Sequence, residues 1–160
     1  MIIMNDQKIA ILIKKLALEF DKIAIPALRP YGLTPTQFKT LKYLYEHENV
    51  IGTDIQNAFS MTNPTVTGIL QNMENTGWIQ RESSTTDLRS KVIKLAKKSI
   101  DKKAELYELG NSLEVKFTKS LTKNEQDKLL PLLNKIMKGI KEWKLSQLKS
   151  ILQAKKIWKG

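Results

Sequence analysis

The sequence predicts a mainly helical fold with one small sheet (α+β), and three observations lead to it. Apolar residues recur at steps of three and four along most of the chain, which is the spacing of a single helical face. Start signals for helices, in which Thr or Asn precedes Pro or stands three residues before Gln or Glu, recur between these stretches. Residues 78–96 differ, because two short alternating stretches flank a polar loop there, as in a two-stranded hairpin.

Length and composition favour one soluble, cytoplasmic domain. The chain has 160 residues, its opening MIIM is too short for the apolar core of a signal peptide, and no apolar run could span a membrane. It has no cysteine, a single histidine and no nucleophile or phosphate-loop motif, so we expect no metal, no cofactor and no enzymatic activity. The formal net charge of +11 favours a polyanionic partner, nucleic acid first and an anionic membrane surface second.

Two helices are predicted first. Residues 6–29 place Ile9, Leu12, Ile13, Leu16, Phe20, Ile23 and Ala24 on one face, and Pro26 should bend or end this helix. The segment LTPTQFKTLKYLYEH then carries Thr34 as N-cap, Pro35 at the first helical position and Gln37 to complete a capping box.

A helix-turn-helix follows. Thr53 and Gln56 repeat the capping box for a short third helix, and the fourth helix should start with Asn63 as its cap and close at Gly77. The inner stripe of the fourth helix is Val66, Ile69, Leu70 and Met73, and its outer face is uncharged until Glu74. Two helices joined by a short turn in this way are typical of a helix-turn-helix.

A hairpin comes directly after the fourth helix. The stretch from Trp78 to Arg81 can pair with Lys91–Ala96 across the loop ESSTTDLRS, which adds a two-stranded wing to the helix-turn-helix. An isolated hairpin is only marginally stable, so the wing must rest on the helices. We expect it to do so through Trp78, Ile79, Ile93 and Leu95.

Long helices make up the remainder. One should run from Lys97 to about Lys119, and a capping box of Thr122 and Glu125 should start another that continues to about Trp158. The apolar seam Leu129, Leu133, Ile136, Ile140 and Trp143 of this last helix would stay exposed unless a second copy covered it. The predicted layout is therefore one domain over 1–160, with a winged unit at 34–97 and dimerisation helices at 5–30 and 98–158. Membrane association stays open for its basic amphipathic end, at Lys149, Lys155, Lys156, Trp158 and Lys159.

The polar outer face of the fourth helix suits the major groove of DNA. Asn and Gln can form two hydrogen bonds to adenine, and Thr can bond a base or pack on the thymine methyl. The predicted recognition residues are Asn63, Thr65, Thr67, Gln71 and Asn72. The alternative, that Asn63 and Thr65 only cap the helix and the other residues form a solvated face, stays open.

The tip of the wing suits the narrow minor groove. Arg89 is long enough to enter it, and the Asp87 carboxylate could hold the guanidinium extended. Possible phosphate contacts are Thr85, Thr86, Ser90, Lys91 and Lys94. The alternative is that Asp87 makes a turn hydrogen bond while Arg89 stays in water.

Several segments together resemble a known family. The order GLTPTQFKTLKYL, NPTVTGIL, NTGWIQRE, DLRSKVIKL and LTKNEQDKLLPLL resembles the MarR family of winged-helix transcriptional regulators, over roughly residues 10–143. The resemblance implies a homodimer whose N-terminal helix and last two helices interdigitate, and a repressor that reads inverted repeats in double-stranded DNA. It also implies a small, often aromatic effector between the dimerisation helices and the winged unit. Candidate lining residues are Phe20, Arg29, Tyr31 and Tyr107.

The sequence departs from the family pattern at two places. Gly68 stands where the family often has a basic residue, and the stretch LAKKS replaces a usual cap and glycine with Ala96 and Ser99, which predicts a smoother strand-to-helix junction. Because the recognition helix has no Lys or Arg, the alternative function is a winged-helix protein–protein interaction module without specific DNA binding. The stretch after about Trp143 exceeds what the family needs and would add dimer contact or a basic flank.

Overall fold

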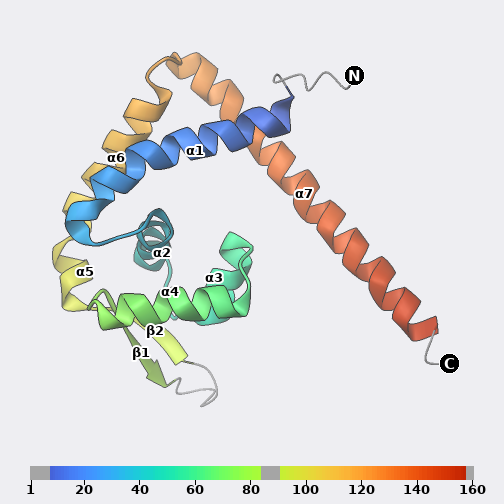
Figure 1. The fold of residues 1–160 in the computed structure, drawn as a ribbon, viewed down its shortest axis with the longest axis horizontal. Coiled ribbons are helices and arrows are strands. Elements are labelled where there is room, and N and C mark those ends of the chain that lie inside the picture. Colours follow the sequence, from blue (N-terminus) through green and yellow to red (C-terminus); the bar gives the residue numbers. More distant parts are fainter. Residues whose placement is uncertain (1–7, 84–90, 158–160) are drawn as a thin grey trace. The chain divides into compact units, whose positions relative to one another are not determined.

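The mainly helical fold with a two-stranded sheet is confirmed by a computed structural model, which describes residues 8–83 and 91–157 (Figure 1). The chain divides into two compact units, Met1–Glu114 and Val115–Gly160. The first unit contains the helix-turn-helix and the wing, and the second contains the long last helix. Within the described part of the chain, no helix is both long and apolar enough to cross a membrane.

The first unit opens with α1 (Ile9–Leu28), which passes into a short 3₁₀ turn, η1 (Arg29–Tyr31). Pro26 does not end α1, which continues for two more residues. Gly32 closes η1 with φ of 64°, a left-handed conformation that glycine adopts without strain.

Helix α2 (Pro35–Glu46) begins with the capping box that the sequence predicts. The Gln37 backbone N–H donates to Thr34 Oγ1 at 3.2 Å, and the Thr34 N–H donates to Gln37 Oε1 at 2.9 Å. Gln37 is buried, so its remaining amide group must also find a partner inside the protein.

The two helices of the helix-turn-helix are α3 (Gly52–Phe59) and α4 (Asn63–Asn75), and both start differently from the prediction. The capping box predicted at Thr53 is wrong, because α3 starts earlier and the Asp54 carboxylate accepts the Ile51 N–H at 2.9 Å. The cap of α4 is one residue off, since Thr62 takes that position. The end of α4 is confirmed: Gly77 has φ of 76° and turns the chain toward the wing.

The wing consists of β1 (Ile79–Ser83) and β2 (Lys91–Leu95), which pair antiparallel with Arg81 opposite Ile93. It rests on the helices as predicted, through buried Trp78, Ile79 and Ile93 and half-buried Leu95. The Ile93 N–H also donates to the Val50 carbonyl at 2.8 Å, which ties β2 to the segment before α3.

The helix predicted from Lys97 to Lys119 is interrupted, and α5 (Lys97–Asp101) and α6 (Lys103–Thr118) replace it. Ser99 is a buried anchor in α5: its hydroxyl donates to the Trp78 carbonyl, and its carbonyl accepts the Tyr45 hydroxyl at 2.7 Å. Ala96 separates β2 from α5, and Ser99 fixes α5 to the base of the wing.

The core of the first unit joins α2, α3, α4, the wing and α6 to the end of α1. Gly110 of α6 packs so closely on α2 that an added Cβ would lie 3.2 Å from Phe38 Cζ. The buried apolar residues are Ala24, Leu28, Leu33, Leu41, Leu44, Val50, Ile55, Val66, Leu70, Met73, Trp78, Ile79, Ile93, Leu106 and Leu113.

The second unit is built on α7 (Lys123–Ile157). Its predicted capping box is confirmed, since the Thr122 N–H donates to Glu125 Oε2 at 2.7 Å and the Glu125 N–H donates to Thr122 Oγ1 at 3.3 Å. The hydrogen bond from the Thr122 backbone N–H, followed by that from the Thr122 hydroxyl, lowers the pKa of the Glu125 carboxyl. The apolar side chains of α7 are exposed at Leu129, Leu130, Leu132, Leu133, Ile136, Met137, Ile140, Trp143, Leu145, Leu148 and Ile151.

Candidate nucleic-acid interface

The N-terminal half of α4 presents a small, ordered polar surface. Asn63 Oδ1 accepts Gln56 Nε2 at 3.1 Å and the Thr67 hydroxyl at 3.4 Å, while the Thr62 and Thr65 hydroxyls lie 2.9 Å apart. These side chains are exposed except for half-buried Gln56. Within the described residues the Asn63 NH₂ has no acceptor, so it can donate to an outside partner.

The C-terminal half of α4 is engaged with the rest of the protein. Gln71 Nε2 donates to Asn75 Oδ1 at 3.0 Å, and Gln71 Oε1 accepts from Arg81 Nη2 at 2.6 Å. Asn72 Oδ1 accepts Gln37 Nε2 at 2.6 Å, which is how buried Gln37 satisfies its second amide group. All five predicted recognition residues therefore have a side-chain partner in the protein, and those of Gln71 and Asn72 include residues of β1 and α2. Both Gln71 and Asn72 are nevertheless exposed.

Arg81 and Glu74, which the sequence analysis did not select as site residues, join the wing to α4. Arg81 Nε and Nη2 donate to Glu74 Oε2 at 2.8 and 2.6 Å, and the Arg81 backbone N–H donates to Glu74 Oε1 at 3.2 Å. The Arg81 hydrogen bonds lower the pKa of the Glu74 carboxyl. The sequence contained one indication of this contact. Glu74, the first charged residue on the outer face of α4, and Arg81, one of few arginines, lie on opposite sides of the Gly77 turn.

The two faces of the wing carry different lysines. The pairing register puts Lys91 opposite Ser83 and Lys94 opposite Gln80, and alternate residues of a strand point to opposite faces. Lys91 shares its face with Arg81, and its charge contributes to the lowered pKa of Glu74. Lys94 lies on the other face. The wing-tip residues predicted to contact DNA, Thr85, Thr86, Asp87, Arg89 and Ser90, lie outside the described residues.

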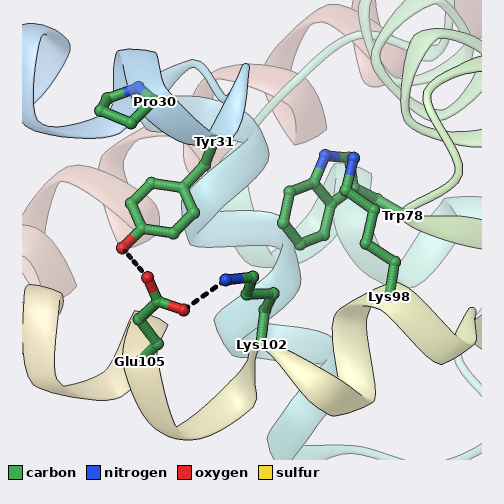
Figure 2. Close-up of a pocket in the computed structure, with 6 residues that line it drawn as sticks. All are labelled: Pro30, Tyr31, Trp78, Lys98, Lys102 and Glu105. Atoms are coloured by element: carbon green, nitrogen blue, oxygen red, sulfur yellow. Dashed lines mark hydrogen bonds and ion pairs between the residues drawn. The ribbon is translucent and has the colours of Figure 1, made fainter.

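A pocket of about 250 Å³ lies where η1, the start of the wing, α5 and α6 meet (Figure 2). The Tyr31 hydroxyl donates to Glu105 Oε1 at 2.7 Å, and Lys102 Nζ lies 2.6 Å from Glu105 Oε2. Lys98 Nζ lies 4.3 Å from the centroid of the Trp78 ring. Hydrogen bonds from Lys102 and then Tyr31 lower the pKa of Glu105, and the bond to Glu105 raises the pKa of Tyr31.

The four predicted effector residues do not gather in this pocket. Tyr31 lines it, whereas Phe20 packs against the core and Arg29 is exposed in η1. Tyr107 instead lies with its ring centroid 5.7 Å from that of Tyr45. The pocket's other lining residues are Pro30, Trp78, Lys98, Lys102 and Glu105.

Comparison with known proteins shows which protein family this winged helix resembles. The MarR family model matches residues 33–91, which run from the end of η1 to the first residue of β2. Residues 33–91 are therefore similar to the winged helix of the MarR family. The proteins of the MarR family are transcriptional regulators that bind DNA and are not enzymes. The match therefore supports a DNA-binding transcriptional regulator as the function class of this chain. Among curated proteins, none matches the sequence.

Solved structures of MarR-family proteins are similar over most of the chain. The S. aureus MepR–DNA complex is 26% identical with a TM-score of 0.77, covering 82% of this chain and 98% of that one. The transcriptional repressor CouR, bound to a 23-mer DNA duplex, is 25% identical with a TM-score of 0.77, and the match covers 84% of this chain and 96% of that one. A mutant MarR from E. coli complexed with operator DNA is 25% identical with a TM-score of 0.73, and the match covers 78% of this chain and 90% of that one.

Proposed function

We propose that the chain is a homodimeric, sequence-specific repressor of inverted-repeat operators, with residues 34–97 as its DNA-binding unit. The observation that carries this is the exposed, uncharged polar surface at the start of α4, beside a wing that presents Lys91. The structural relatives with DNA in their complexes, including one described as a repressor, support the same function.

The first half of α4 is the proposed base-reading element. The Asn63 NH₂ can donate to a base acceptor, while the Thr65 and Thr67 methyl groups suit a thymine methyl. Gln71 could read a base only by exchanging the partners of both its amide oxygen and its NH₂. Asn72 accepts from Gln37 through its oxygen, and its NH₂ can still donate to a base.

The wing is the proposed minor-groove and phosphate-binding element. Lys91 is an exposed basic residue on the same face of the wing as Arg81. The predicted tip residues Thr85, Thr86, Asp87, Arg89 and Ser90 would extend this element. In this proposal Arg89 enters the minor groove and Asp87 orients its guanidinium. Phosphate contacts from the wing would compensate for the lack of Lys and Arg on α4.

The proposed dimer rests on bare apolar faces in both units. In α1 the side chains of Leu12 and Leu16 are 48% and 45% exposed, and in α7 those of Leu130 and Trp143 are each 63% exposed. Many exposed apolar side chains on one helix are typical of a protein interface. A second copy with the 5–30 and 98–158 helices would cover both faces and set two copies of α4 about 34–36 Å apart, one turn of DNA.

The pocket of Figure 2 supports an effector that relieves repression. Tyr31 supplies aromatic surface above buried Trp78, and the two ammonium groups of Lys98 and Lys102 outnumber the Glu105 carboxylate, which together suit a small aromatic anion. Trp78 also begins the wing, so a ligand there could change the DNA-competent population if it binds the two forms with different affinity.

The direct test of DNA binding is fluorescence anisotropy with the gene's own upstream DNA and with scrambled DNA at one salt concentration. We expect tighter binding to the upstream DNA. Equal affinity for both would exclude the specific repressor, and a stable protein partner without a DNA footprint would favour the interaction module instead.

A matched pair of lysine variants tests the role of the wing. Lys91→Ala should weaken binding and reduce the slope of log K against log salt by about one, as the loss of a phosphate contact does. Lys94→Ala removes the same charge from the opposite face of the same strand and should leave both quantities near wild type. Equal effects of the two variants would exclude a phosphate contact that is specific to the face of the wing that carries Lys91.

A further inference from the structure

Arg81 makes an unusually complete connection between the wing and α4. Its side chain donates to both Glu74 and Gln71, and its backbone N–H donates to Glu74 as well. The Glu74 carboxylate therefore accepts hydrogen bonds from both the main chain and the side chain of Arg81 in β1. We call the three residues Arg81, Glu74 and Gln71 the Arg81 brace.

The environment of the brace makes it stronger than a surface ion pair. The side chains of Arg81 and Glu74 are 18% and 32% exposed, whereas the Lys97–Asp101 pair on α5 is 86% and 55% exposed. Partial burial reduces solvent screening, and charge-assisted hydrogen bonds are stronger than neutral ones. Such a contact can fix the angle of a hairpin that would be mobile by itself.

We propose that Arg81 is a positioning residue for DNA binding, which holds the wing at a fixed angle to α4 and commits Gln71 to this brace instead of to base reading. This rests on the proposed function. A free Gln pairs with adenine through both its amide oxygen and its NH₂. Gln71 has its oxygen on Arg81 and its NH₂ on Asn75, so base reading falls to the other polar residues of α4.

The competing role for Arg81 is a direct phosphate contact. Its Nε and Nη2 groups are occupied by protein oxygens, and only 18% of its side chain is exposed. A phosphate contact would contribute to the salt dependence of binding, but a positioning residue would not. The slope of log K against log salt therefore separates the two roles.

The experiment combines two measurements on Arg81→Met and Arg81→Lys, with Lys97→Met as the control that removes one cation from an exposed pair. Hydrogen exchange on the DNA-free protein reports the brace itself. In Arg81→Met we expect amides of β1 and β2 to exchange faster while those of α6 stay at the wild-type rate, since the fold is retained. Lys97→Met should change neither set.

The DNA measurement reports the positioning. Arg81→Met should lose about tenfold in affinity for the specific DNA, with an unchanged salt slope, and Arg81→Lys should recover part of the loss because one ammonium can still reach Glu74. Gln71→Ala should lose less than about twofold and keep the base preference, whereas Thr67→Ala should alter it.

Three results would overturn the inference: unchanged wing exchange in Arg81→Met, a salt slope reduced by about one in that variant, or a changed base preference in Gln71→Ala. Absence of specific binding by the wild-type protein would instead exclude the proposed function. The exchange measurement still decides in that case whether the brace holds the wing, because it uses no DNA.

Discussion

The winged helix and the last helix contain apolar stripes of the same spacing, yet their surroundings differ. In the winged helix, Leu41, Leu70 and Met73 are almost completely covered by neighbouring elements. In α7, Ile136 and Ile140 repeat at the same helical step and are 38% and 45% exposed. Periodicity therefore identifies an apolar face, but it does not say whether the same chain or a second copy covers it.

The largest expected effect is in the covered region. Leu41→Ala should destabilise the winged helix by about 2–5 kcal/mol, because Leu41 is completely buried and its removal leaves a cavity. Urea unfolding followed by far-UV circular dichroism measures this loss. The loss should not depend on protein concentration, since this core is formed within one chain; a strong concentration dependence would mean that the core is shared between copies.

Substitutions in the exposed apolar stripe of α7 should instead affect association between copies and leave the stability of the winged helix almost unchanged. Ile136→Asp with Ile140→Asp should raise the dimer dissociation constant at least about 100-fold while changing the unfolding of the winged helix little. Sedimentation equilibrium measures the association. The control pair Asn134→Asp and Ser146→Asp adds the same charge to α7 without removing apolar surface. A dimer that survives both pairs equally would show that the stripe on α7 is not its interface.

A matched pair of glycines sharpens the comparison further. Alanine is a better helix former than glycine, so Gly139→Ala, which meets nothing within 4 Å in α7, should stabilise by about 0.5–1 kcal/mol. Gly110→Ala should instead destabilise by about 1 kcal/mol, because the new Cβ lies 3.2 Å from Phe38 and overpacking outweighs the helical gain. Thermal unfolding measures both. A loss in Gly139→Ala would indicate that a second copy approaches α7 closely at that residue.

The same contrast explains which features the sequence could predict. The capping boxes at Thr34 and Thr122 were predictable because each is completed within four residues. The one at Thr53 was wrong because Asp54, also local, reaches Ile51 and moves the start of α3. Competition between two nearby caps is decided by the exact backbone path, which periodicity does not give.

The candidate site was predictable only in its outline. The outer face of α4 follows from helical spacing, but the brace does not, because Arg81 reaches Glu74 across the Gly77 turn. The partners of Gln71 and Asn72 likewise come from other elements. The pocket is harder to predict, because its lining comes from η1, α5, α6 and the residues just before β1 and α6. Of the predicted effector residues it contains Tyr31.

A further expected effect concerns a polar contact inside the covered region. Burial raises the pKa of Tyr45 from 10.0 to about 12, with a smaller contribution from Tyr107, and the Tyr45 hydroxyl donates to the Ser99 carbonyl. A folded-state pKa above the unfolded one means that the stabilisation is complete below pH 10.0 and is lost as the pH rises through about 12. The covered region should therefore weaken in this window.

Tyr45→Phe tests this assignment, because phenylalanine keeps the ring and removes the titrating hydroxyl. The variant should be slightly less stable at neutral pH, by about 0.5–1.5 kcal/mol for one hydrogen bond, but its urea midpoint should fall less between pH 10 and 12 than that of the wild type. The tyrosinate absorbance should also lose a late-titrating component. If both proteins lost stability in parallel over this window, the alkaline sensitivity would belong to another group, and the anchoring of α5 through Ser99 would not depend on ionisation of Tyr45.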